Sequence, residues 1–378
     1  MKKVLPQVIT LFIIILIFGF FTFNANINMS SRGMEFGYSF LKRAASFDIQ
    51  FSLIEYSRES SYGRAYLVGL LNTLLVAFSG IIFATFLGLF FGIARLSQNF
   101  LIKKFAAFYV EFFRNLPLLL QLFFWYYAAL RVLPLPHETE GFYSFFLTIK
   151  SLYTPSLVWE NLSLFLYLII FSIILVFILK KYFKKIQQNR GKQYPILYIS
   201  ILILIVVPSL SLIFGLSSFE IEYPVYKQLS KTSGTFIGGL AIPPEFIALF
   251  LALSLYTGTF IAENVRAGIE GISKGQKEAA ASIGLNNKQI LNLVVLPQAL
   301  RIIIPPTTNQ YLNLTKNSSL AAAIAYPDLV LVFAGTALMQ TGRAIEIVSI
   351  TMLTYLSISL SISILMNYYN KKVSLTEK

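Results

Sequence analysis

Residues 278–297 read EAAASIGLNNKQILNLVVLP, a polar stretch punctuated by Gly284 and Lys288 that separates two long apolar runs. The run before it, residues 246–262, has no charged side chain, and neither does the run after it, residues 302–315. Charged groups are costly inside a membrane, so a charged loop between such runs belongs in water. We therefore expect this stretch to be presented to a soluble partner.

The composition indicates a polytopic membrane protein. Of 378 residues, 56% are hydrophobic and 13% are charged, whereas soluble proteins average about 25% charged. The formal charge of +14 is explained by Lys and Arg gathered in cytoplasmic loops beside anionic lipid, and nucleic acid is not an expected partner. Without cysteine, disulfides and cysteine-ligated metals are excluded. The single histidine, His137, lies in a Pro-rich loop, where a structural or solvated role is favoured over catalysis.

We expect an all-α bundle of about eight transmembrane spans with both termini in the cytoplasm, because several stretches exceed the roughly 18–20 apolar residues that a bilayer requires. Six cations between Lys180 and Lys192 place that loop inside. Residues 302–342 are too long for one helix, and we predict a broken helix to about Ala323 followed by a shallow segment at the outer face. The predicted spans are residues 5–23, 65–94, 105–133, 161–180, 195–218, 245–267, 302–323 and 346–369.

The first apolar run, Val8–Phe23, is longer than the core of a signal peptide, which is typically about 7–15 residues. The following Asn24-Ala25-Asn26 is a poor cleavage site, so a retained helix is favoured over a cleaved signal peptide. Residues 24–64 are mixed polar and predict an outer loop with one short amphipathic helix.

Small residues recur every fourth position in the second predicted span, at Gly80, Ala84, Gly88 and Gly92. This spacing puts them on one helix face, where a neighbouring backbone can approach closely. A packing seam inside the subunit is favoured over a seam between subunits.

Two acid–base pairs stand at an i,i+3 offset, Glu111 with Arg114 and Glu263 with Arg266. Such side chains share a helix face and can pair, and ionisable groups in a membrane need a partner or a protein interior. Each pair either fixes helix depth or lines a translocation path. Pro117 predicts a kink that frees a backbone carbonyl.

Enzyme motifs are missing from the chain. It has no G-x-x-x-x-G-K-[ST], G-x-S-x-G or H-E-x-x-H sequence, so ATP hydrolysis by this chain, and enzymatic activity in general, is not expected. Ion-coupled transporters use lone carboxylates near the midplane, and these are not evident here. An ion-coupled secondary transporter remains the first alternative, and a non-transporting scaffold or receptor subunit the second.

The spacing Glu278-Ala279-Ala280, Gly284, Val294, Leu296-Pro297 resembles the cytoplasmic signature, the EAA loop, of binding-protein-dependent ABC importer permeases, with Val294 where Ile is commonest. Further stretches resemble the polar amino-acid (histidine, glutamate, glutamine and arginine) subfamily. These are Asn72-Thr73-Leu74, Tyr109-Val110-Glu111, Arg114-Asn115-Leu116-Pro117-Leu118, Phe260-Ile261-Ala262-Glu263, Arg266-Ala267-Gly268-Ile269, Lys274-Gly275-Gln276, Leu296-Pro297-Gln298-Ala299 and Lys316-Asn317-Ser318-Ser319-Leu320.

The resemblance implies a type I (MetI-like) importer permease fold. It covers two core pieces, residues 65–133 and 245–370, the second with a coupling loop at 268–301. An insertion at 134–244 with two extra spans and an N-terminal part at 1–64 depart from the compact five-helix version. Both are similar to the longer permeases of general L-amino-acid importers, which work with a second permease. Residues 371–378 would form a cytoplasmic tail.

The resemblance also implies a function in the bacterial inner membrane: ATP-driven import of amino acids delivered by a periplasmic binding protein. ATPase subunits carrying ATP and Mg would dock on a short helix, since residues 279–281 are good helix formers and Gly284 can end a helix. This chain itself would bind no cofactor. The expected coupling residues are Glu278, Ala279, Ala280, Gly284, Leu296 and Pro297. Those expected to face the pathway, or else to hold helices together, are Glu111, Arg114, Asn115, Glu263, Arg266, Lys316 and Asn317.

Overall fold

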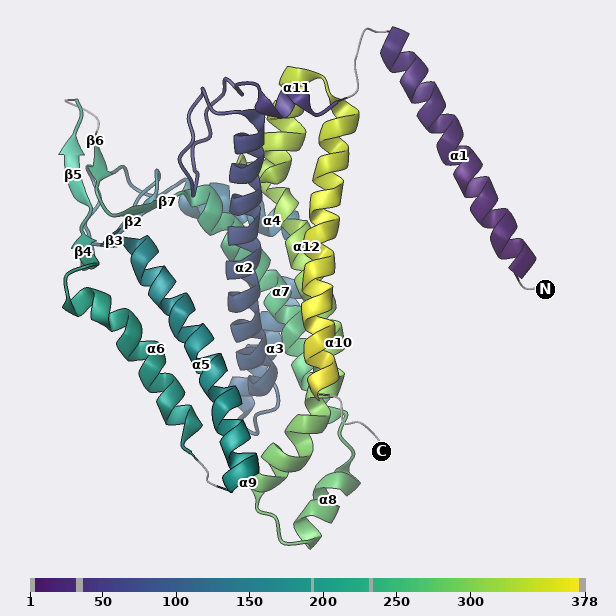
Figure 1. Ribbon diagram of the computed structural model, residues 1–378, viewed down its shortest axis with the longest axis vertical. Helices are drawn as coiled ribbons and strands as arrows, with labels where there is room; N and C mark the ends of the chain where they lie inside the picture. The colour runs from purple at the N-terminus through teal and green to yellow at the C-terminus, as the bar shows by residue number, and fades with distance from the viewer. Residues whose placement is uncertain (1–3, 32–36, 192–193, 231–233, 374–378) are drawn as a thin grey trace. The chain divides into compact units, whose positions relative to one another are not determined.

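The computed structural model describes residues 4–31, 37–191, 194–230 and 234–373 (Figure 1). Lys2, Lys3, Lys192 and the end of the predicted tail beyond Val373 lie outside the described residues. The chain divides into two compact units: unit 1 comprises Met1–Tyr126 and Glu245–Lys378, and unit 2 comprises Tyr127–Pro244.

Unit 1 is built from helices, which confirms the predicted all-α membrane bundle. Within the described residues of the whole chain, six helices are long and apolar enough to cross a membrane. Four belong to unit 1: α2 (Tyr62–Ala94), α7 (Pro244–Glu270), α12 (Ala344–Val373) and a continuous helical run from Asn287 to Ile324. The run comprises α9 (Asn287–Gln289), a π-helical turn (Ile290–Val295), α10 (Leu296–Asn317) and a 3-10 turn (Ser318–Ile324).

The two remaining predicted spans of this unit differ from simple helices. The predicted span 5–23 lies within α1 (Val4–Ser31), which continues past the expected end at Phe23. The predicted span 105–133 is divided into α3 (Phe100–Asn115), α4 (Leu118–Phe123) and a π-helical turn (Phe124–Leu130).

Pro117 causes this division, as its sequence position predicted. A proline has no N–H to donate to the carbonyl four residues earlier, which here belongs to Phe113. The buried side chain of Gln121 donates instead, to Phe113 O at 2.8 Å and to Leu116 O at 3.1 Å. The carbonyl oxygens at the kink are therefore satisfied inside the chain, as a membrane interior requires.

The small-residue face of α2 packs inside unit 1. A β-carbon on Gly80 would stand 3.3 Å from Leu314 of α10 and 3.8 Å from Ser254 of α7. Further along, a β-carbon on Gly92 would lie 2.8 Å from the carbonyl oxygen of Ala262. The spacing therefore marks a packing seam within the subunit, the favoured interpretation.

The predicted break after residue 323 is confirmed. After the 3-10 turn, Ala325 adopts a left-handed conformation (φ 60°), and the helix resumes as a π-helical turn (Val330–Ala337) followed by α11 (Leu338–Thr341). Two side chains of α2 hold the non-helical backbone between: Asn72 Nδ2 donates to Pro327 O at 2.9 Å, and Thr73 Oγ1 accepts from Leu329 N at 3.0 Å. Protein thus surrounds this segment, the condition under which such backbone is tolerated at membrane depth.

Residues 37–61 lie against the α11 end of unit 1. They contain one short 3-10 helix, Ser39–Lys42. Its Phe40 is buried against Tyr62 and Phe333. Gly37 N donates to the buried Glu346 at the start of α12, at 3.1 Å.

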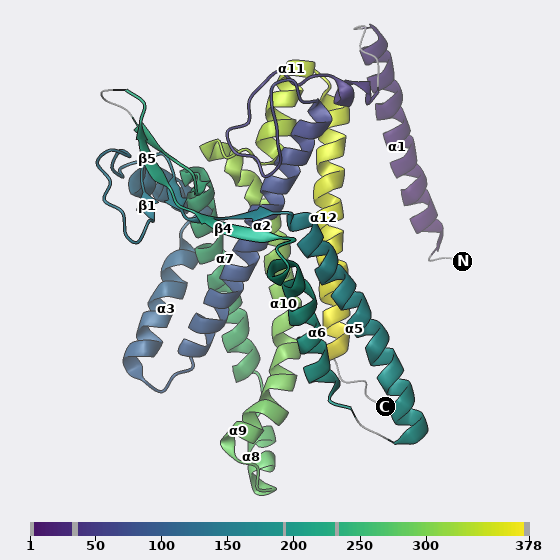
Figure 2. The same cartoon turned by 60° about the vertical axis from the view of Figure 1, so that its left-hand side comes forward.

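Unit 2 contains the two predicted helices, which form a hairpin, and short strands, which were not predicted. α5 (Leu162–Arg190) and α6 (Ile196–Ile213) lie side by side (Figures 1 and 2). The segments on either side of the hairpin form three small antiparallel sheets. Their strands are β1 (Phe146–Leu147), β2 (Leu152–Thr154), β3 (Ser156–Glu160), β4 (Ser218–Glu222), β5 (Val225–Gln228), β6 (Gly234–Ile237) and β7 (Leu240–Ile242).

Candidate functional site

Residues 274–285 fold as a short helix followed by a tight turn. α8 (Lys274–Ser282) is followed by Gly284, whose φ of +83° lies where a residue with a β-carbon is strained. Leu285 N donates to Ala280 O at 3.2 Å and Gly284 N to Ala281 O at 2.9 Å. This pair of hydrogen bonds is the Schellman arrangement that satisfies the last carbonyls of a helix.

The chain then returns to the bundle through α9, whose first turn has an N-terminal cap. Asn286 and Gln289 form a capping box, each side chain accepting from the other's backbone N–H at 3.0 Å. The π-helical turn 290–295 leads directly into α10, with Pro297 in its first turn. Because the helical run from Asn287 to Ile324 is continuous, the missing N–H of Pro297 removes one backbone hydrogen bond within this run, directly after the π-helical turn.

The outer surface of this loop combines polar and apolar groups. Glu278 is exposed, whereas Ala280 on the opposite side of α8 is 5% exposed. Ile283 is 77% exposed and Leu293 is 65% exposed. A loop that leaves a carboxylate and two aliphatic side chains uncovered has the composition of a docking surface, since apolar groups gain by being removed from water.

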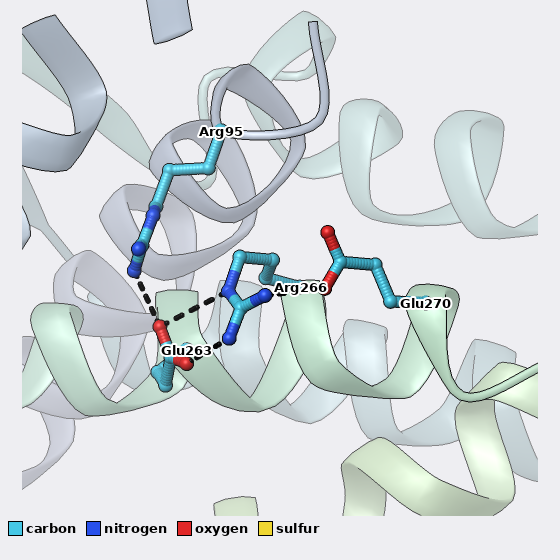
Figure 3. A network of polar contacts seen from close by, with 4 residues as sticks. All are labelled: Arg95, Glu263, Arg266 and Glu270. Carbon is cyan, nitrogen blue, oxygen red and sulfur yellow. Dashed lines mark hydrogen bonds and ion pairs between the residues drawn. The ribbon is translucent and has the colours of Figure 1, made fainter. Parts of the chain in front are cut away.

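A four-residue ion network joins α2 to α7 near the same end of unit 1 (Figure 3). Glu263 accepts from Arg95 and from Arg266, and Arg266 also donates to Glu270. The sequence predicted the pairing of Glu263 with Arg266, which is confirmed. Arg95 was missed, because nothing in the sequence links a residue of the α2–α3 turn to α7.

The other predicted pair, Glu111 with Arg114, does not form an ion pair in the described structure. Arg114 lies in the last turn of α3, and its guanidinium sits over the ring of Phe260, 5.5 Å from the centroid. Glu111, Arg114 and Asn115 are all exposed on unit 1. An i,i+3 offset permits a pair, but here the aromatic face attracts the cation.

Lys316 and Asn317 end α10, well away from Glu263. A β-carbon on Gly80 would approach both Leu314 of α10 and Ser254 of α7, so these two residues lie at a similar level of the bundle. Glu263 lies nine residues after Ser254, which at about 1.5 Å per residue places it roughly 13 Å further along α7. The residues predicted to face the pathway are therefore not all in one place, because Lys316 and Asn317 lie at a different level of the bundle from Glu263 and Arg266.

A pocket of about 460 Å³ opens beside Lys316, between α10, the π-helical turn at 330–337 and α12. Ser319, Thr351, Tyr355 and Ser359 contribute to its wall. None of the ion pairs in the described part of the chain includes Lys316. An exposed ammonium beside four hydroxyl groups can bind a carboxylate or another anionic group.

Metal binding has no candidate here: within the described residues, no group of three or more His, Asp or Glu side chains is placed to hold an ion.

Residues 80–375 match the family model of the binding-protein-dependent transport system inner membrane component. The chain belongs to this family. The match extends from α2 through unit 2 to the end of α12.

Three relatives align with this chain over nearly its whole length. It is 44% identical to YhdX of Escherichia coli (strain K12), named as an amino-acid ABC transporter permease protein, over 98% of this chain and 94% of that protein. It is 44% identical to the general L-amino acid transport system permease protein AapQ of Rhizobium johnstonii, over 100% of this chain and 93% of that protein. It is 38% identical to the glutamate/glutamine/aspartate/asparagine transport system permease protein BztB of Rhodobacter capsulatus, over 94% of this chain and 89% of that protein. Unit 2 is therefore part of what these proteins share.

Proposed function

We propose that this chain is the permease subunit of an ATP-driven importer and carries L-amino acids delivered by a periplasmic binding protein. Membership of the family supports the transport role, and the names of the relatives support the substrate class. The observation that carries the coupling role is α8, a capped helix whose Glu278 and Ile283 are exposed to solvent.

The partner at α8 is proposed to be an ATPase subunit, which supplies ATP and Mg on its own surface. In a groove of that surface, Glu278 would accept polar contacts and Ile283 would bury its side chain. Gly284 would keep the turn that returns the chain to α10, with Leu296 and Pro297 at its first turn. Movement of α8 then passes to α10 without an intervening flexible linker, because the π-helical turn continues directly into it.

The orientation follows from this docking. The ends of the helices that carry residues 95–104 and 268–301 would face the cytoplasm, with both chain termini on the same side in a bacterial inner membrane. The opposite end, with residues 37–61 and α11, would face the binding protein. A second, different permease is the proposed partner within the membrane.

The proposed pathway runs past the exposed Glu111, Arg114 and Asn115, past Asn317 and past the pocket beside Lys316. Charges of both signs together with hydroxyl groups suit an amino-acid zwitterion in a low-dielectric passage. Glu263 and Arg266 already have partners within the chain, which favours the alternative that they hold helices together.

The test is uptake by the complete importer reconstituted in proteoliposomes with ATP inside. Glu278→Lys and Gly284→Arg are expected to abolish uptake and association of the ATPase subunit, while membrane insertion remains. Ile283→Asp is expected to weaken association by about tenfold or more, since burying such a side chain contributes about 1.5–3 kcal/mol.

A matched pair separates the turn from the helix. Gly284→Ala strains a positive φ, whereas Gly275→Ala adds a β-carbon where nothing lies within 4 Å. Only the first should reduce uptake. Undiminished uptake by the Glu278 and Gly284 variants, or uptake driven by an ion gradient without ATPase subunits, would exclude the coupling role and favour the secondary-transporter alternative.

A further inference from the structure

The two-stranded ribbon of β3 and β4 in unit 2 has an apolar face. Its register pairs Leu157 with Ile221 and Trp159 with Phe219. These four side chains share one face, because successive residues of a strand alternate between faces. Leu157 is 57% exposed, Ile221 is 50% exposed and Phe219 is 49% exposed, so the described residues leave much of this face uncovered.

The opposite face of the ribbon is acidic. Besides Val158 it contains the three carboxylates of the two strands, Glu160, Glu220 and Glu222, and all three are exposed. Ser218 Oγ donates to Glu160 Oε2 at 2.8 Å, as expected for residues that are directly paired on one face. Neither strand contains a lysine or an arginine to balance these charges. Because carboxylates are costly inside a membrane, this face belongs in water.

The apolar face continues directly onto the surface of α5. Only Asn161 separates β3 from this helix. The ring centroid of Trp159 lies 4.9 Å from that of Phe165, in the first turn of α5, and 5.3 Å from that of Phe219. The next residue, Leu166, is exposed on the helix. Since α5 is long and apolar enough to cross a membrane, such side chains contact hydrocarbon when it does, and the apolar face of the ribbon adjoins them.

Two hydrogen bonds fix the ribbon to the end of the α5–α6 hairpin. Asn161 Nδ2 donates to Leu216 O at 3.2 Å, and Ser217 Oγ donates to Asn161 O at 3.4 Å. They join the start of α5 to the segment between α6 and β4. Figure 2 shows β4 lying across this end of the hairpin and not along its axis. A ribbon placed in this way lies along the membrane surface when the two helices span.

We propose that the β3–β4 ribbon is an interfacial membrane anchor, whose apolar face binds phospholipid of the leaflet at the Leu162 end of α5. Lipid is the occupant because the face is continuous with the hydrocarbon-facing surface of α5, while the opposite face keeps its three carboxylates in water. Tryptophan is enriched at this depth of the bilayer, and Trp159 is at the junction of ribbon and helix. Amphipathic segments with such faces lie in the plane of the interface, so the ribbon fixes the depth of the hairpin.

The experiment uses nitroxide spin labels, because the chain contains no cysteine and one introduced cysteine gives one labelled position. Leu157→Cys and Val158→Cys are a matched pair of neighbouring aliphatic positions, 57% and 46% exposed, on opposite faces of one strand. Ile221→Cys and Glu220→Cys are the corresponding pair on the other strand. Each labelled full-length chain is assembled with its transport partners in phosphatidylcholine vesicles. Electron paramagnetic resonance then measures collisions with oxygen, which concentrates in hydrocarbon, and with a neutral nickel chelate, which stays in water.

Labels at Leu157 and Ile221 should collide more with oxygen than with nickel, and labels at Val158 and Glu220 should show the reverse. A second change tests the apolar contact itself. With the label at Leu157, Ile221→Asp should raise collisions with nickel and lower those with oxygen, because a carboxylate is expelled from the lipid. Val158→Asp adds the same charge to the acidic face and should leave both collision rates unchanged.

Two results would overturn the proposal. Collisions dominated by nickel at all four positions would place the whole ribbon in water. A label at Leu157 that is shielded from both reagents in the assembled complex would assign the apolar face to a protein interface. The readout does not use transport, so it can fail while the proposed function holds, and the reverse.

Discussion

Arg95, the first residue after α2, donates to Glu263 of α7 across 168 positions of the sequence (Figure 3). Glu263 simultaneously accepts from Arg266, so one carboxylate serves two guanidinium groups. The Arg95 and Glu263 side chains are 18% and 26% exposed, so the pair is screened only in part. The contact ties the α2–α3 turn to the helix that leads into α8.

Removing this carboxylate is expected to cost more than removing one of its partners. Glu263→Gln leaves two cations facing each other, whereas Arg95→Gln leaves Glu263 paired with Arg266. We expect about 1 kcal/mol for Arg95→Gln, after allowing for partial solvent exposure, and about two to three times as much for Glu263→Gln. Thermal melting of the purified protein measures both. The double variant should melt close to Glu263→Gln alone; full additivity would mean that the two side chains act independently.

The packing seam of α2 gives a second prediction. A β-carbon on Gly88 would press into the side chain of Ile261 and stand 3.2 Å from the backbone nitrogen of Ala262. Gly88→Ala should therefore destabilise the protein by about 1–3 kcal/mol through overpacking, although alanine is the better helix former by about 1 kcal/mol. Gly19→Ala in α1, where nothing lies within 4 Å, is the control and should not lower the melting temperature. Equal melting of the two variants would show that the seam tolerates a methyl group.

Features that depend on neighbouring positions could be predicted from the sequence. The helical spans follow from runs of apolar residues, and the seam from spacing at every fourth residue. The turn after α8 follows from a glycine placed three residues after a run of three alanines. In each case the physical cause lies within about one or two helical turns of the residue concerned, so the sequence itself contains it.

Features that depend on packing between residues far apart in the sequence could not be predicted from it. The partner of Glu263 comes from another helix, and the choice of Arg114 between Glu111 and Phe260 is decided by where α7 lies. The strand Ser156–Glu160 reads SLVWE, with three consecutive apolar residues, so it lacks the alternation of polar and apolar residues that is typical of strands. Its five-residue ladder also needs the partner strand Ser218–Glu222, which follows only after the whole α5–α6 hairpin.

Acid should loosen the exposed loop at Asp48. Arg58 Nε donates to Asp48 Oδ2 at 2.7 Å, and this hydrogen bond together with the charge of Arg58 lowers the pKa of Asp48 below its usual value. A depressed carboxyl pKa means that the contribution is present above the unfolded-state pKa, about 4, and is lost as the pH falls through the lower folded-state pKa.

The readout for this loop is hydrogen exchange at Ser46, whose N–H donates to Arg58 O at 2.9 Å. Its protection factor, corrected for the intrinsic dependence on pH, should fall below about pH 4 in the native chain. Asp48→Asn should show the lower value at every pH. A pH profile shared by both proteins would mean that the ion pair does not hold this loop closed.

The kink at Pro117 gives a prediction that couples two positions, because Pro117 and Gln121 both act on the carbonyl oxygen of Phe113. In the native chain Gln121 satisfies the oxygen that Pro117 leaves without a donor. Gln121→Leu should therefore destabilise the protein by about 1–3 kcal/mol, the penalty for a buried polar group without a partner. Pro117→Ala supplies an N–H that bonds to Phe113 O once residues 116 and 117, both extended in the native chain, become helical, so the same Gln121→Leu change should then cost much less. Thermal melting of the four proteins gives the coupling between the two positions. A coupling near zero would mean that Gln121 stabilises this region through its packing and not through the carbonyl freed by the proline.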